Sequence, residues 1–233
     1  YKMRALVFDT GSIISLVTNN LLWILGPLKK QFRGSFLISE AVKEEIINHP
    51  LKTKKFKLEG LMVQDYLREG VFSLAKNKYS SVEAEELLDL ANSCFSTKGH
   101  PVKIVDKAEI ETLMIVLENR ALAMVIDERT LRLLVENPKK LEKVLESRLH
   151  TNIKMNKKNV DKFKELTQDI KIMRSTELAY IAYKLNLLNR YITAKKVLDP
   201  TLKKELLEGA LWALKLKGCS ISGEEINEML GMR

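Results

Sequence analysis

Two aspartates each come directly after an apolar run that is typical of a buried strand. Asp9 follows the segment 6–8, and Asp127 follows the segment 121–126. In open parallel α/β sheets, ligands bind outside the carboxyl ends of the strands. A carboxylate held at that edge can reach a bound cation. Each aspartate could instead only cap the helix that follows it, but the occurrence of two such placements favours a site.

A third acid falls on the inward face of a predicted helix. The segment 40–48 reads as a helix that ends before Pro50. Helical periodicity puts Glu45 between two apolar positions of the inward face, whereas Glu44 lies farther round toward solvent. An inward carboxylate needs a partner, because burying an unpaired charge is costly. The partner is either a cation in the site or a nearby lysine.

Two further acids, Glu109 and Glu111, lie in the predicted helix 107–119. They flank its apolar face on opposite sides, so periodicity does not choose between them, and either could simply favour the positive end of the helix dipole. Several convergent carboxylates without His or Cys make a hard-oxygen site suited to Mg²⁺ or Mn²⁺. Such a site can activate water and stabilise charge on a phosphodiester.

The predicted secondary structure shows which elements would bring these acids together. Apolar strand-like runs alternate with amphipathic helical segments, which predicts an α/β fold with a parallel sheet covered on both faces. Residues 96–105 are predicted to form a loop, and the tail is predicted to form a helical hairpin packed on the α/β domain. The five predicted strands are 4–9, 35–38, 71–75, 121–126 and 170–173.

The charge balance indicates a polyanionic partner. The 233 residues carry a formal net charge of +9, and a basic run contains Lys52, Lys54 and Lys55. Such a surface favours RNA, DNA or an anionic membrane, although the run itself could be no more than a solvated turn. No run of eighteen apolar residues is present, so a membrane span is not expected. Two cysteines, far apart in the sequence, indicate a reducing cytoplasm.

Five segments resemble the PIN-domain nucleases in their amino-acid sequences and in their order along the chain. The matching pieces cover about residues 1–190, and they are LVFDTGSII, ISEAVKEEI, AEIETLMIV, AMVIDERTLRLL and IMRSTELAYIAYKLNLL. The resemblance implies a PIN-like three-layer α/β/α domain over residues 1–193 with a mostly parallel five-stranded sheet. Residues 76–105 would be a helical insertion in it, and residues 194–233 a C-terminal helical extension.

The resemblance also implies a function and a set of residues. The family commonly cleaves RNA with a divalent metal, which predicts an endoribonuclease that uses Mg²⁺ or Mn²⁺ and that could form a homodimer. Carried over residue by residue, its acids fall at Asp9, Glu45, Glu111 and Asp127, with Glu109 as the substitute for Glu111. Two hydroxyl residues, Ser12 and Thr130, would lie close enough to hydrogen-bond water or phosphate.

Other functions stay open. A PIN-like module that binds RNA without cutting it would use the lysine run as its main surface, and some family members are toxins of the VapC type. Asp106-Lys107-Ala108-Glu109 stands where relatives often have Gly-Glu, and the long insertion argues against a simple toxin. The phrase DTGS also occurs in aspartic proteases, but those enzymes need two such aspartates in a β-rich fold, and this chain has one.

Overall fold

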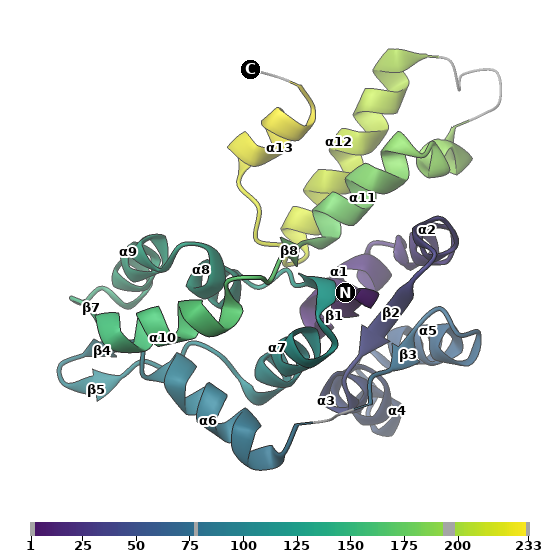
Figure 1. Ribbon diagram of the computed structural model, residues 1–233. Helices are drawn as coiled ribbons and strands as arrows, with labels where there is room; N and C mark the ends of the chain where they lie inside the picture. Colours follow the sequence, from purple (N-terminus) through teal and green to yellow (C-terminus); the bar gives the residue numbers. More distant parts are fainter. Residues whose placement is uncertain (1–2, 77–78, 193–198, 232–233) are drawn as a thin grey trace.

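A central parallel sheet organises the protein. The computed structural model describes residues 3–76, 79–192 and 199–231 (Figure 1). All neighbouring strands of the five-stranded sheet run parallel, which confirms the predicted α/β fold. Across the sheet, the strands are β3 (Ser73–Leu74), β2 (Ser35–Ile38), β1 (Met3–Phe8), β6 (Ala121–Val125) and β8 (Ile172–Met173).

Alternate residues of each strand point to opposite faces, so the sheet carries two cores. Phe8, Phe36 and Val125 belong to one core, and Val7 and Met124 belong to the other. The ring centroids of Phe8 and Phe36 lie 5.1 Å apart. The continuous apolar pattern of β1 and β6 in the sequence follows from this double burial.

The first core is covered by α1 (Thr10–Thr18), η1 (Leu22–Ile24), α2 (Leu25–Phe32), α5 (Lys57–Arg68) and α11 (Ser175–Lys184). The apolar pattern of residues 13–25 predicts one helix, but the chain forms α1 and η1 instead, because Asn20 between them lies in the left-handed region with φ 54°. The pair formed by α1 and Leu22–Phe32 is bent by 112°, and no single described helix is long and apolar enough to cross a membrane.

A distorted helical run after β2 carries the adjacent glutamates Glu44 and Glu45. It consists of α3 (Glu40–Lys43), a π-helical turn η2 (Glu44–Asn48) and α4 (His49–Lys52). The predicted end before Pro50 is wrong: the chain stays helical, and Pro50 occupies the first turn of α4, where its lack of an N–H is tolerated. The π turn adds a residue to the helix and re-aims the side chains around it.

The second core lies on the other face and extends into a lateral lobe (Figure 1). Its helices are α6 (Ser81–Asn92), α7 (Lys107–Asn119), α8 (Arg129–Glu136), α9 (Pro138–Leu149) and α10 (Lys157–Thr167). The predicted loop 96–105 instead begins with a hairpin: β4 (Phe95–Thr97) pairs antiparallel with β5 (His100–Pro101) and with β7 (Lys154–Met155). The segment 76–105 therefore holds both a helix and a hairpin.

The C-terminal helices pack on the first core. α11 is followed by η3 (Leu187–Tyr191), α12 (Pro200–Leu216) and α13 (Gly223–Met229). Leu207, Leu211 and Leu214 of α12 are buried in that core. The segment between α12 and α13 descends to β8 and the start of α8 (Figure 1). It returns the chain to the carboxyl edge of the sheet.

Candidate functional site

Asp9 lies at the end of β1 and is 5% exposed. Its backbone N–H donates to the carbonyl of Val125 at 2.9 Å, which fixes it against β6. Its carboxylate caps α1 by accepting from the backbone N–H of Gly11 at 3.1 Å. Burial raises the pKa of Asp9 to about 7; the Gly11 hydrogen bond opposes this rise, and the charges of Asp106 and Glu45 add to it.

Glu45 approaches this edge from η2. The hydroxyl of Thr10, the residue after Asp9, donates to Oε2 of Glu45 at 2.7 Å. Glu44 turns away instead, because it accepts from Asn48 at 2.5 Å and pairs with Lys52 at 3.4 Å. Of the two adjacent glutamates, Glu45 is the one whose charge acts on Asp9, although its side chain is exposed rather than buried.

Glu109 is the acid of α7 that faces Asp9. It is 8% exposed and forms a capping box with Asp106: each residue's backbone N–H donates to the other's carboxylate, at 2.8 and 2.9 Å. The pKa of Glu109 is raised to about 9, mainly by burial; the hydrogen bond from the Asp106 backbone opposes the rise, and the charges of Asp106, Asp9 and Glu128 add to it. Helix α7 packs against both β1 and α3, which brings the three acidic elements together.

Glu111 points elsewhere. Its carboxylate lies 3.9 Å from the ammonium of Lys107. Burial, with the charges of Glu111 and Glu118, raises the pKa of Tyr79 to about 12. The sequence pattern left Glu109 and Glu111 undecided, and the resemblance favoured Glu111. The structure brings Glu109 to Asp9 and separates Glu111 from it.

Asp127 has different partners. It is 2% exposed, and its two carboxylate oxygens accept from the backbone N–H and the hydroxyl of Ser175, at 2.7 and 2.6 Å. Ser175 is the first residue of α11 and follows β8 closely, so the hydrogen bonds of Asp127 link the end of β6 to the start of α11. The next residue, Glu128, caps α8 through the backbone N–H groups of Thr130 and Leu131, and its charge reaches Glu109.

We call Asp9, Glu45, Asp106, Glu109 and Glu128 the acidic cluster. None of them forms an ion pair with a lysine or arginine among the described residues. In the same part of the chain, no three Asp, Glu, His or Cys side chains converge closely enough to hold a metal ion. Each carboxylate of the cluster accepts a hydrogen bond within the protein instead: four accept from residues nearby in the chain, and Glu45 accepts from Thr10.

The two hydroxyl residues expected near a substrate are buried. Ser12 is fully buried, and its hydroxyl donates to the carbonyls of Asp9 and Val125, at 2.8 and 3.2 Å. Thr130 is 5% exposed and lies in the first turn of α8. Ser12 therefore joins the ends of β1 and β6 and does not face solvent.

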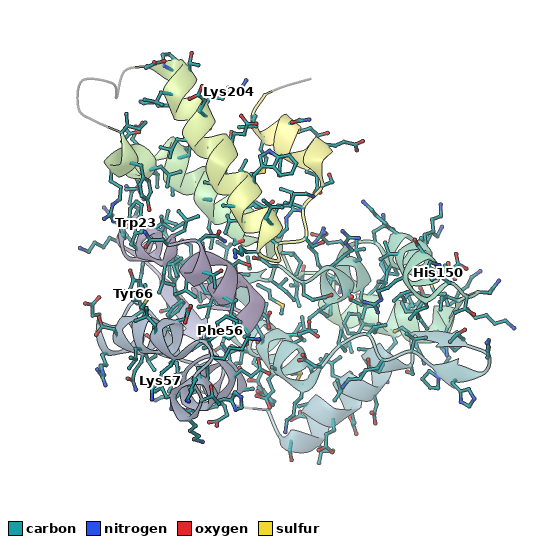
Figure 2. The ribbon with its side chains drawn as sticks, turned by 180° about the vertical axis from the view of Figure 1, so that it is seen from behind. Trp23, Phe56, Lys57, Tyr66, His150 and Lys204 are labelled. Carbon is teal, nitrogen blue, oxygen red and sulfur yellow. The ribbon has the colours of Figure 1, made fainter. Side chains whose placement is uncertain are left out.

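The basic run spans the connection between α4 and α5, from Lys52 at the end of α4 to Lys57 at the start of α5. The side chains of Lys52, Lys54, Lys55 and Lys57 are exposed, and Lys55 lies over the ring of Phe56 with 5.0 Å to its centroid. Figure 2 labels Phe56 and Lys57 in this region, and Phe56 is 42% exposed. We call residues 52–57 the lysine loop; it continues directly from the helical run that carries Glu45.

Some of the contacts that position the acids at this edge were not predicted from the sequence. Asp106 and Glu109 form an Asp-x-x-Glu capping box, a pattern that is visible in the sequence and fixes the direction of Glu109. Thr10 and Ser175 carry no such local signal, because their partners lie 35 and 48 residues away along the chain.

Fold and site together define a parallel α/β protein with an acidic cluster at the carboxyl edge of its sheet. Comparison of the chain with protein-family models, with curated proteins and with solved structures gave no significant match. The resemblance to PIN-domain nucleases therefore stays a prediction made from the sequence.

Proposed function

We propose that the protein is a PIN-like, metal-dependent endoribonuclease that hydrolyses RNA at the acidic cluster. The observation that carries the proposal is Asp9: a buried carboxylate at a strand end, with a pKa raised to about 7 by burial and by neighbouring acids. Strongly perturbed carboxylates of this kind are typical of functional sites. A divalent cation would supply the positive charge that the described part of the cluster lacks.

The donor chemistry of the cluster fits Mg²⁺ or Mn²⁺, because all its donors are hard carboxylate oxygens. Metal binding requires side chains to turn, since no three described donors converge as they stand. Glu45 is exposed and is held through Thr10, so it can reorient readily. Glu109 would have to give up its bond to the Asp106 backbone N–H.

A bound divalent cation would lower the pKa of a water molecule and offset charge on the phosphodiester. The chain's own residues would do the rest. Asp9 is held rigid by its bond to Gly11, Thr10 orients Glu45, and the burial around Asp9 and Glu109 strengthens electrostatic interactions at this edge. The lysine loop would hold the RNA backbone, and its exposed ammonium groups suit phosphate contacts.

RNA cleavage with purified protein tests the proposal. Wild type should cut labelled single-stranded RNA in Mn²⁺ but not in EDTA, and Asp9→Asn should lower the rate by about 100-fold or more. Glu111→Gln is the matched control, because it also removes one acid charge but lies away from the cluster. Absence of metal-dependent cleavage by the wild type across varied RNAs would contradict the proposal.

A second candidate is an RNA-binding module that does not cut. It is favoured by the hydrogen bonds within the protein that already engage the acids, and by the absence of a three-ligand group among the described residues. RNA binding of equal strength in EDTA and in Mn²⁺, without cleavage, would support it. A cytoplasmic location and a homodimer remain predictions from the sequence for either function.

A further inference from the structure

A small basic pocket lies between α8, α9 and the segment that joins α12 to α13. Its volume is about 220 Å³, and its lining includes Arg129, Arg132, Lys140, Ser220 and Ser222. A pocket of this size is smaller than the roughly 300–1,000 Å³ of typical small-molecule sites. It suits a single compact group rather than a whole nucleotide.

The pocket keeps unbalanced positive charge. Arg132 pairs with Glu136 at 3.2 Å. The Glu225 carboxylate in the wall pairs at 2.9 Å with Arg174, which also pairs with Glu177 at 2.6 Å. Arg129 and Lys140 have no carboxylate partner among the described residues. Counted with their partners, the four cations and three carboxylates of this region keep a net charge of +1, which favours an anionic ligand such as a phosphate.

Hydrogen-bond donors in the wall suit an acceptor-only anion. Ser220 Oγ accepts from Nε of Arg129 at 2.9 Å, and Ser222 Oγ accepts from the backbone N–H of Glu225 at 3.0 Å. Both hydroxyl hydrogens therefore remain to be donated. Arg132 donates to the carbonyl of Ser220 at 3.2 Å, and its buried Nε has no partner in the described structure.

The pocket adjoins the acidic edge of the sheet. The backbone N–H of Ser220 donates to the carbonyl of Asp127 at 2.9 Å. Arg129 directly follows Glu128, a member of the acidic cluster. One end of a bound RNA could therefore be held in this pocket while the rest of the RNA extends past the acidic cluster.

We infer that this pocket binds a terminal phosphate of the RNA substrate. The inference rests on the proposed function for its substrate class, but phosphate recognition is a separate property that needs neither metal nor cleavage. The C-terminal helices then have a role in recognition, because Ser220 and Ser222 come from the segment between them. An RNA with a terminal phosphomonoester would be bound in preference to the same RNA ending in a hydroxyl.

The test is fluorescence anisotropy with one RNA sequence bearing either a 5′-phosphate or a 5′-hydroxyl, and a second pair that differs at the 3′ end. EDTA is present, so binding is measured without cleavage. Wild type should bind one phosphorylated RNA about tenfold more tightly than its hydroxyl partner, as expected for charge-assisted hydrogen bonds. The double variant Arg129→Gln/Lys140→Gln should lose this preference.

Lys139→Gln is the matched control, because Lys139 is exposed and precedes Lys140 in the chain but lines a different pocket. It should retain the preference, and Lys140→Arg should retain it too. Equal affinity of wild type for the phosphorylated and hydroxyl RNAs would overturn the inference. Inorganic phosphate that binds by calorimetry as tightly as the phosphorylated RNA would overturn the RNA terminus as the ligand. Loss of cleavage activity alone would bear on the proposed function and not on this pocket.

Discussion

Replacing Asp9 by Asn should stabilise the metal-free protein, and the gain should depend on pH. The pKa of Asp9 is raised from 3.8 to about 7, mainly by burial. Between pH 3.8 and about 7, Asp9 keeps its proton in the folded protein, whereas in the unfolded chain it has released it. Ionisation of Asp9 therefore does not lower the free energy of unfolding below pH 4. It lowers that free energy progressively as the pH rises toward 7.

The size of the effect follows from the shift. Each pKa unit corresponds to about 1.4 kcal/mol, so a rise of about 3 units is worth about 4 kcal/mol at pH 8, as an order of magnitude. Asparagine has nearly the same shape, carries no charge, and its amide oxygen can still accept from Gly11. Asp9→Asn should thus match the wild type near pH 4 and exceed it by a few kcal/mol at pH 8.

Urea unfolding in EDTA, followed by circular dichroism from pH 4 to 8.5, measures this difference. Asp89→Asn is the control, because Asp89 is an exposed acid on α6, and its substitution should change the free energy of unfolding by no more than about 0.5 kcal/mol. A stability difference for Asp9→Asn that does not change with pH would refute the reasoning. So would a variant that is less stable than wild type at pH 8.

Four further substitutions test the two acids of α7 and two residues that hold the C-terminal part of the chain on the sheet edge. Glu109→Gln keeps the capping box and should stabilise the metal-free protein at pH 8 by a few kcal/mol, because the pKa of Glu109 is raised to about 9. Glu111→Gln should change stability by less than about 0.5 kcal/mol in the same urea titration. Ser175→Ala removes a donor to buried Asp127 and should cost about 1–3 kcal/mol at pH 7, seen as a lower urea midpoint. Arg174→Ala should cost at least about 2 kcal/mol and increase amide hydrogen exchange in α13, to which Arg174 is bonded.

The regular elements were predictable where local signals agree. Helix α7 has the predicted bounds, because the Asp106 cap and the apolar periodicity both specify its start and face. Strands β1, β2 and β6 fall within a residue of their predicted ends, since each is a short apolar run between polar turns. Burial on both faces explains why these runs were continuous and not alternating.

The irregular elements were not predictable from the same signals. The β4–β5 hairpin turns at Lys98 and Gly99, both with positive φ, and lysine is an unusual residue for that conformation. Its strands are two and three residues long and polar in part, so no period-two pattern is visible. The π turn at Glu44–Asn48 likewise has no sequence signature, and it carries the helix past Pro50.

The acidic edge was predicted in part. Asp9 was placed from a strand followed by a turn, and the preference for Glu45 over Glu44 agrees with the hydrogen bond from Thr10. The direction of Glu109 depends on a capping contact, and the engagement of Asp127 depends on Ser175. The second of these is a long-range contact, which residue spacing along the chain does not specify.

Calorimetric titration of the protein with Mn²⁺ at pH 8 and pH 6 tests the central claim most directly. If the acidic cluster is a metal site, wild type binds Mn²⁺ at pH 8 and Asp9→Asn does not. Binding weakens at pH 6, because protons compete for Asp9, whose pKa is about 7. Absence of Mn²⁺ binding at pH 8, or binding of equal strength in wild type and Asp9→Asn, would contradict the claim.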